Sequence, residues 1–200
     1  MVQKATGTPS ARGRPPKFDR EAVVDAAIKA FWAEGLDATT LPELEVATGV
    51  DRSTLYNSFG GKTGLYELAT ARYLEQAEDW LFGPLRDGSD DGFSDILEFL
   101  QRLGSGLTSE TAQPGCLIVN HMGSGQHHDP GNRYQEMLET SLIAALTRAG
   151  DRSSHRIQLR AALMASSVVG INLMSRAGRS AAEIGHFVDA LTAQVEAWRS

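Results

Sequence analysis

The 200-residue sequence predicts an all-α fold, with an N-terminal three-helix unit that contains a helix-turn-helix and a longer helical C-terminal part. Three observations lead to this prediction. Residues 39–65 have the pattern of two short helices joined at a glycine, followed by the start of a third helix. Apolar residues recur three and four positions apart through the rest of the chain, which is the spacing of one helix face. No segment shows a convincing two-residue alternation of a strand, so no sheet is expected.

The first helix is expected over residues 20–33. Val23, Ala27 and Phe31 lie four apart and form an apolar face that supports the helices after it. Gly35 is expected to end this helix, because glycine accepts the left-handed conformation that helix ends often need.

The helix-turn-helix signal begins at Thr40, which stands three residues before Glu43. This is the spacing of a capping box, in which each side chain bonds the backbone N–H of the other residue. Pro42 is tolerated in the first turn, where backbone N–H groups have no partner within the helix. Gly49 is expected to end this helix, and Asp51 to cap the next one.

The second short helix has polar side chains suited to nucleic acid. Arg52, Ser53, Thr54, Tyr56 and Asn57 can donate to phosphates and base edges, whereas an ordinary surface helix more often has Glu and Lys. Double-stranded operator DNA is therefore the predicted partner. Arg52 is expected to contact bases, because side chains at the start of a recognition helix reach base edges.

Two more residues are expected to position this unit on DNA without reading its sequence. Thr40 and Lys62 stand at predicted helix N-termini, where free backbone N–H groups favour a phosphate. The alternative for Lys62 is a solvated surface charge.

The net charge of −6 hides an uneven distribution. Residues 1–20 have five basic side chains and one acidic side chain, whereas residues 73–200 have ten arginines, no lysine and sixteen acidic side chains. Residues 1–18 are therefore expected to be a flexible basic arm whose Arg12, Arg14 and Lys17 follow a DNA groove. The alternative is a solubilising tail.

The remaining composition is that of an ordinary globular protein, with 42% hydrophobic and 22% charged residues. No apolar run approaches the roughly 20 residues of a membrane span, and the N-terminus lacks the apolar region of a secretory signal. A single cysteine, Cys116, excludes an intramolecular disulfide framework. We therefore expect a cytoplasmic protein with no membrane partner.

The C-terminal part is expected to contain six helices. Gly83–Pro84 is expected to end the first of them, and residues 86–92 to form a polar linker. By apolar spacing and helix-ending glycines, the six helices are expected over residues 62–82, 93–107, 116–122, 131–149, 152–176 and 181–198.

The residues of the helix-turn-helix resemble the tetracycline-repressor (TetR) family of bacterial transcriptional regulators. The matching positions are Phe31 through Gly35, Thr39–Thr40, Leu44, Thr48–Gly49–Val50, Ser53, Leu55–Tyr56, Phe59, Lys62 and Leu65. Glu45, Gly60–Gly61 and Gly64 depart from the family pattern. The resemblance implies a helix-turn-helix domain at residues 19–64 and a helical effector-binding and dimerisation domain at residues 65–200. It also implies a homodimer through the last two helices that binds palindromic DNA as a ligand-released repressor.

A mostly apolar effector pocket is expected between the middle helices. Small-molecule sites combine apolar walls with a few polar groups. The same residues would equally serve as ordinary core. The candidate ligand-binding residues are Trp80, Phe99, Leu103, Cys116, Leu117, Asn120, Met137 and Met164.

Three other functions are open to residues of the C-terminal part. Cys116 and His121 would make a thiol nucleophile and base, but five positions on one helix would place them on different faces, so we expect no enzyme. Residues 126–129, Gln-His-His-Asp, have metal-ligand chemistry, although adjacent loop histidines are more often solvated. The alternative to ligand sensing is a redox- or metal-responsive repressor that uses Cys116 and the nearby histidines. No cofactor or bound metal is predicted.

Overall fold

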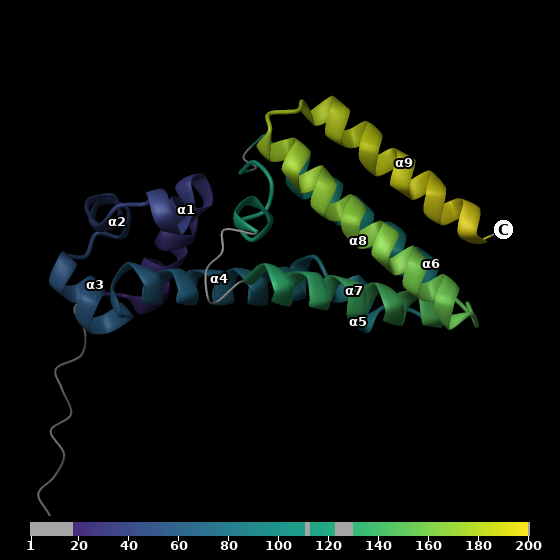
Figure 1. Cartoon of the computed structure of the whole chain (residues 1–200), viewed down its shortest axis with the longest axis horizontal. Coiled ribbons are helices and arrows are strands. Elements are labelled where there is room, and N and C mark those ends of the chain that lie inside the picture. Colours follow the sequence, from purple (N-terminus) through teal and green to yellow (C-terminus); the bar gives the residue numbers. More distant parts are fainter. Residues whose placement is uncertain (1–17, 111–112, 123–129, 200) are drawn as a thin grey trace, which may run out of the picture.

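The computed structural model describes residues 18–110, 113–122 and 130–199, and all regular secondary structure in these ranges is helical. The arm residues Arg12, Arg14 and Lys17 and the His-His segment 126–129 lie outside the described residues. Three helices gather at one end of a long fourth helix (Figure 1). Their bounds are α1 Arg20–Ala38, α2 Leu41–Thr48, α3 Arg52–Phe59 and, for the long helix, α4 Gly61–Trp80.

The N-terminal core lies between α1, α3 and α4. Phe31 and Leu55 are fully buried there, and the ring of Phe31 meets Tyr66 of α4 edge-on at 5.1 Å between centroids. α4 then continues from this group of helices into the C-terminal part, as the blue ribbon below α1 and α2 in Figure 1 shows. A displacement of α4 would therefore move the N-terminal helices.

The C-terminal helices form a bundle in which α6 packs against α7 and α9, and α7 packs against α8. α8 and α9 run antiparallel to each other, as their green and yellow ribbons show (Figure 1). The bounds are α5 Gly83–Asp87, α6 Gly92–Thr108, η1 Val119–His121, α7 Pro130–Arg148, α8 Ser154–Arg176 and α9 Ala181–Arg199.

The helix predicted over residues 116–122 is wrong. The chain there forms turns and one short 3-10 helix, η1, because tertiary packing buries residues 116–119 and long-range bonds at Gly115 and His121 hold both flanks of the segment. The linker predicted over residues 86–92 is also partly wrong, since α5 extends through Asp87. Pro84 falls in the first turn of α5, where a proline fits a helix start.

The apolar stripe of α9 packs inside the chain instead of waiting for a partner. Ile184, Val188 and Val195 are buried, and Leu191 and Trp198 are partly buried against the same core. These residues of α9 therefore belong to the core of one chain, so a homodimer through the last two helices would have to use other side chains. The exposed apolar side chains of α8 and α9 lie outside this stripe, and most of them are on α8.

Candidate nucleic-acid interface and buried cavity

The helix α2 begins at the predicted capping box. The Thr40 backbone N–H donates to Glu43 Oε2 at 2.7 Å, and the Glu43 N–H donates to Thr40 Oγ1 at 3.4 Å. The Thr40 hydroxyl also donates to Glu43 Oε2, at 2.8 Å. Both donors of Thr40 are thus engaged by Glu43, so a phosphate contact from Thr40 requires the capping box to open.

Two carboxylates meet the N-terminus of α3. Asp51 accepts from the Thr54 N–H at 2.7 Å, and Glu45 accepts from the Arg52 N–H at 2.7 Å. Hydrogen bonds from Thr54 lower the pKa of Asp51, because they stabilise its charged form. Glu45 departs from the family pattern, and its position in the structure supplies the reason: it caps the neighbouring helix.

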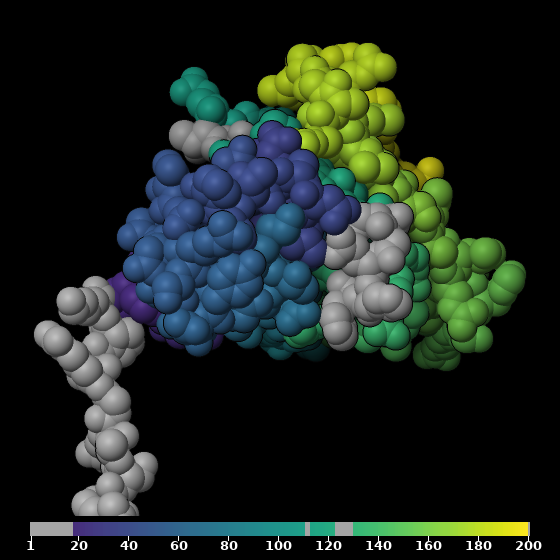
Figure 2. Space-filling model, turned by 60° about the vertical axis from the view of Figure 1, so that its left-hand side comes forward, coloured from purple at the N-terminus to yellow at the C-terminus, as the bar shows by residue number. Residues whose placement is uncertain are grey.

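The outer face of α3 holds the predicted contact side chains. Arg52, Ser53, Tyr56 and Asn57 are exposed, whereas Thr54 is half-buried. The Asn57 amide donates to Ser53 Oγ at 3.1 Å, which orients both side chains along the same face. In Figure 2 this part of the molecule is the blue surface that faces the viewer, and α8 and α9 lie at its far edge.

The turn between α3 and α4 explains the glycines that depart from the family pattern. Gly60 and Gly61 both have positive φ, 76° and 74°, which few other residues adopt. A Cβ on Gly61 would lie 3.0 Å from the Tyr56 ring, and a Cβ on Gly64 would lie 2.1 Å from the Phe59 carbonyl oxygen. These glycines allow α3 and α4 to approach closely and let the Tyr56 ring lie across the turn.

Lys62 points toward the connection between α1 and α2. Its ammonium donates to the carbonyl oxygens of Thr39 at 2.9 Å and Asp37 at 3.2 Å. Because an ammonium has three N–H donors, one remains for another acceptor such as a phosphate. Sequence reasoning did not anticipate this structural role of Lys62.

Two residues at the start of the described chain join α1 to α3, and the sequence pattern did not reveal them. The Arg20 guanidinium donates to the Ser58 carbonyl at 2.6 Å and lies 4.6 Å from the centre of the Phe59 ring. Phe18 packs on the same ring at 5.6 Å. The segment that leads to the predicted basic arm is therefore fixed against the recognition helix.

A small cavity of about 110 Å³ lies between α1, α4, α6 and the segment 113–116. Of the predicted pocket residues, Trp80, Leu103 and Cys116 line it. Phe99, Leu117 and Met164 are instead buried in the core, Met137 is half-buried against that core, and Asn120 donates to the Pro114 carbonyl. The other residues that line the cavity are Trp32, Tyr73, Ala77, Leu81, Gly106, Leu107, Gln113, Gly115, Tyr134 and Asn172.

The Cys116 thiol faces a tyrosine rather than a base. The Tyr73 hydroxyl donates to Cys116 Sγ at 3.2 Å, and burial raises the pKa of both groups. A raised pKa keeps Cys116 as the unreactive thiol, since the thiolate is the nucleophile. His121 bonds the Phe31 carbonyl instead, so the structure does not pair Cys116 with His121.

Trp80 lies at the mouth of the cavity. It is 53% exposed, and its ring passes so close to Gly106 that a Cβ there would lie 2.8 Å away. Trp32 of α1 also lines the cavity and meets the Tyr73 ring edge-on at 5.0 Å. An indole from α1 thus lines a cavity whose other walls come mainly from the helices that follow it.

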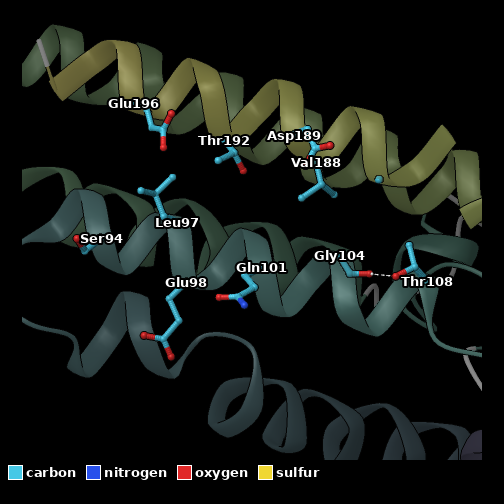
Figure 3. A pocket seen from close by; sticks show the side chains of 11 residues that line it. Ser94, Leu97, Glu98, Gln101, Gly104, Thr108, Val188, Asp189, Thr192 and Glu196 are labelled. Atoms are coloured by element: carbon cyan, nitrogen blue, oxygen red, sulfur yellow. Dashed lines mark hydrogen bonds between the residues drawn. The ribbon is translucent and has the colours of Figure 1, made fainter. Parts of the chain in front are cut away.

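A larger and more open groove of about 780 Å³ lies between α6 and α9 (Figure 3). Its walls include the carboxylates Glu98, Asp189 and Glu196, together with Leu97 and Val188. Its lining residues come from α6 and α9 alone, so a molecule bound there would not touch α1 or α4. The smaller cavity is the better candidate for an effector that acts on DNA binding.

Three large apolar side chains are exposed on α8. Leu159, Leu163 and Leu173 are 58%, 51% and 48% exposed, and Phe187 of α9 is 41% exposed. By length and composition α8 would also qualify as a membrane span, but core helices of soluble proteins meet the same criterion, and α8 packs on α7, α9 and η1. Among the described residues, no three His, Cys, Asp or Glu side chains come together as metal ligands.

The N-terminal helices are similar to those of a known protein family. Residues 23–69 match the model of the family described as "Bacterial regulatory proteins, tetR family". The chain is 34% identical over 110 residues to the HTH-type transcriptional repressor ComR of Escherichia coli (strain K12), a match that covers 55% of this chain and only 52% of ComR. It is 26% identical over 170 residues to the HTH-type transcriptional repressor BdcR of the same organism, covering 84% of each chain.

The fold extends this similarity to nearly the whole chain. A cysteine mutant of the TetR family transcriptional regulator CifR, solved with a 26-bp double-strand operator DNA, superposes with a TM-score of 0.80 at 23% identity. That superposition covers 92% of this chain and 100% of the CifR chain. At this level of identity the similarity establishes the shared fold.

Proposed function

The chain belongs to the TetR family of bacterial regulatory proteins, and from this we propose that it is a sequence-specific DNA-binding transcriptional repressor released by a small effector. The observation that carries the proposal is the α2–α3 pair, in which two capped helices present Arg52, Tyr56 and Asn57 on one exposed face. The relatives ComR and BdcR are transcriptional repressors, which supports this proposal. A cytoplasmic location fits this role.

Base reading and phosphate contact are proposed for different side chains. Arg52 is exposed at the first turn of α3, where a guanidinium can donate twice to guanine. Lys62 is proposed to give its remaining N–H to a phosphate while the other donors hold the α1–α2 connection. The arm residues Arg12, Arg14 and Lys17 are proposed to add contacts in the minor groove.

The DNA test is a gel shift with the DNA upstream of the protein's own gene, followed by selection from a randomised operator library. Arg52→Ala should relax preference at one base pair per half-site, by about 1–3 kcal/mol. Arg152 is an exposed arginine before α8. Arg152→Ala therefore removes the same charge and should leave the base preference unchanged. An unchanged preference in Arg52→Ala would remove Arg52 from the reading set.

Salt dependence separates the role of Lys62. Lys62→Ala should weaken binding to all sequences alike and lower the salt slope by about one ion per subunit. Circular dichroism must accompany this measurement, because the variant also loses two bonds to the α1–α2 connection. An unchanged slope in a folded variant would leave Lys62 with its structural role alone.

We propose that the chain is a homodimer through α8 and α9, and that it binds a palindrome. The exposed leucines of α8 and Phe187 support this, because such a face excludes water only against a partner. The two recognition helices would then contact half-sites about 34–36 Å apart or a multiple of that spacing. Gly170 lies on α8 with open space where a Cβ would be, which permits close helix approach.

Sedimentation of the purified chain at micromolar concentration tests the dimer. Leu163→Glu should give monomers, because it places a charge in the apolar face, whereas Ile143→Glu on α7 is a matched change outside it. Leu191→Glu is a poor probe because Leu191 packs against the core of its own chain. A monomeric wild type would contradict the proposal.

We propose that a small apolar or aromatic effector enters the cavity beside Cys116 and shifts α4. The cavity is lined by Tyr73, Ala77 and Trp80 of α4, so occupancy acts on the helix that continues into the N-terminal domain. Its volume of about 110 Å³ is smaller than the roughly 150 Å³ that holds benzene. A larger effector therefore has to displace a wall, and the exposed Trp80 is the wall that can move.

A screen of apolar and aromatic compounds tests the effector proposal. A true effector should raise the melting temperature, change the fluorescence of Trp32 and Trp80, and release DNA. Ala77→Leu, which adds three carbon atoms at the wall, should reduce all three responses. If no compound raises the melting temperature or releases DNA, the effector proposal fails.

A further inference from the structure

α1 has a break in its helical geometry near its carboxyl end, at Gly35. Gly35 has φ 76° and ψ −176°, so the regular helix stops at Glu34 and resumes for one short turn. The last carbonyl groups before such a break lack their usual donors and bear the negative end of the helix dipole. Donors from elsewhere in the chain are therefore needed to stabilise this end of α1.

The C-terminal domain supplies these donors. An Arg176 guanidinium N–H donates to the Ala33 carbonyl at 2.5 Å, and His121 Nε2 lies 3.1 Å from the Phe31 carbonyl. Because a carbonyl only accepts, His121 must have its proton on Nε2. A Cβ on Gly35 would lie 2.6 Å from the His121 ring, so the ring occupies the space that the missing side chain leaves at the break.

The same region forms a wall of the cavity. The Trp32 indole N–H donates to the Pro114 carbonyl at 3.1 Å, and Trp32, Gly115 and Cys116 all line the cavity. Asn120 donates to the same Pro114 carbonyl at 2.9 Å. One short segment, residues 113–122, thus touches the cavity with its first part and the end of α1 with its last part.

Gly115 connects this segment rigidly to α8. Its buried N–H donates to Ser175 Oγ at 3.0 Å, and its φ is 71°. A Cβ there would lie 2.8 Å from the Asn172 carbonyl oxygen and 2.3 Å from Asn120 Oδ1. Gly115 therefore cannot shift without moving its neighbours. A displacement of the cavity wall would also displace residues 116–122 or α8.

We propose that residues 113–122 and Arg176 form a latch on the carboxyl end of α1, and that a displaced cavity wall opens it and lowers DNA affinity. This inference rests on the proposed repressor function. It adds a second route to the α4 route, since the latch acts on α1, which packs against α2 and α4. The latched form has the small cavity of about 110 Å³, and it is the DNA-binding form.

Two matched pairs of variants test the latch. Arg176→Ala removes a latch donor, whereas Arg179→Ala removes an equal charge from a side chain that bonds Glu183 instead of α1. Gly115→Ala places a methyl group against Asn120 and Asn172 and so displaces the latch at the end beside the cavity. Gly178→Ala is the control, because Gly178 also has a positive φ, 82°, but its Cβ would meet no other atoms. Trp32→Phe keeps a ring in the cavity but loses the donor to Pro114.

The first readout is hydrogen exchange measured by mass spectrometry on the free protein. Arg176→Ala, Gly115→Ala and Trp32→Phe should each speed exchange in both residues 33–39 and residues 113–122, while the two controls match the wild type. Unchanged exchange in the latch variants would overturn the latch, whatever their DNA affinity.

The second readout is the dissociation constant for the operator fragment found in the gel shift. Arg176→Ala should weaken binding about tenfold, which corresponds to loss of one charge-assisted hydrogen bond, with unchanged base preference. The double variant Arg176→Ala/Trp32→Phe should bind DNA only slightly more weakly than Arg176→Ala, because the first change has already opened the latch. Faster hydrogen exchange in Arg176→Ala with unchanged operator affinity would overturn the proposed effect of the latch on DNA binding. Losses of affinity that add up in the double variant would show that Arg176 and Trp32 do not act in one latch. A wild type that binds no DNA would instead overturn the repressor function itself.

Discussion

The α2–α3 pair and the segment 113–122 are both short, and both hold functional side chains in position, but they are held in opposite ways. The caps of α2 and α3 join residues three apart, Thr40 with Glu43 and Asp51 with Thr54. Segment 113–122 is held by bonds to Trp32, Phe31 and Ser175, which lie 60 to 90 positions away in sequence. Locally held elements form with little help, whereas the segment has its conformation only inside the finished fold.

The largest expected effects come from removing the apolar anchor of each region. Leu55 and Leu117 are both fully buried, so each change to alanine should cost about 2–5 kcal/mol of unfolding free energy. Leu55→Ala should also abolish operator binding, because Leu55 and Phe59 are the buried residues of α3. Leu117→Ala should leave base preference intact. Urea unfolding and anisotropy titration measure both, and operator binding at wild-type strength by Leu55→Ala would break the comparison.

Ser175→Ala tests a long-range bond. It leaves the buried Gly115 N–H without its acceptor, which should cost about 1–3 kcal/mol. Ser167→Ala is the control on the same helix, because the Ser167 hydroxyl returns to the Leu163 carbonyl and should matter little. Thermal unfolding of the two proteins compares them. Equal melting temperatures would mean that the segment does not depend on its distant partners.

Thr40→Ala tests a local bond and should have a smaller effect. Loss of an N-cap costs about 0.5–2 kcal/mol, and Thr40→Ser should restore it because serine offers the same hydroxyl. The loss should appear as fraying of α2 in hydrogen exchange, with residues 113–122 unaffected. Faster exchange in both regions would show that the two are coupled and would weaken the contrast.

The smallest expected effect is a difference in the pH at which segment 113–122 and the α2–α3 caps lose stability. Burial lowers the pKa of His121 below its usual 6.5, against opposing contributions from the carbonyls of α1 and Glu34, while Arg176 lowers it further. A lowered pKa means that the stabilisation is complete above pH 6.5 and is lost as the pH falls through the pKa of the folded state. The latch should therefore weaken first as the solution is acidified.

The caps should persist to lower pH. Hydrogen bonds from Thr40 lower the pKa of Glu43, and those from Thr54 lower the pKa of Asp51, so these carboxylates lose their contribution only as the pH falls below 4.5 and 3.8 respectively. Tryptophan fluorescence, which includes Trp32, should show a step as the pH falls below 6.5, before the caps are affected. His121→Gln should remove that step, since glutamine still donates to the Phe31 carbonyl and does not titrate; its persistence would assign the step to another group.

The sequence by itself determined the parts that depend on near neighbours. The capping box at Thr40, the left-handed Gly49 and the Asp51 cap were all predicted correctly, because each joins residues close in sequence. The same holds for the long apolar helices, whose spacing repeats locally. The predicted contact residues of α3 stand on one exposed face for this reason, although their contact with DNA stays a prediction.

Only the tertiary structure decided the rest. Residues 116–122 look helical, yet bonds to distant residues hold Gly115 and the His121 side chain on either side, and the segment forms turns and η1. Leu103 lines the cavity and Phe99, one turn earlier on α6, does not, because the fold leaves space beside one and fills it beside the other. The stripe of α9 has the pattern of an interface, yet α6 and α8 cover it. Spacing along a helix indicates that a face is apolar, but the packing of distant segments determines whether that face meets core, cavity or partner.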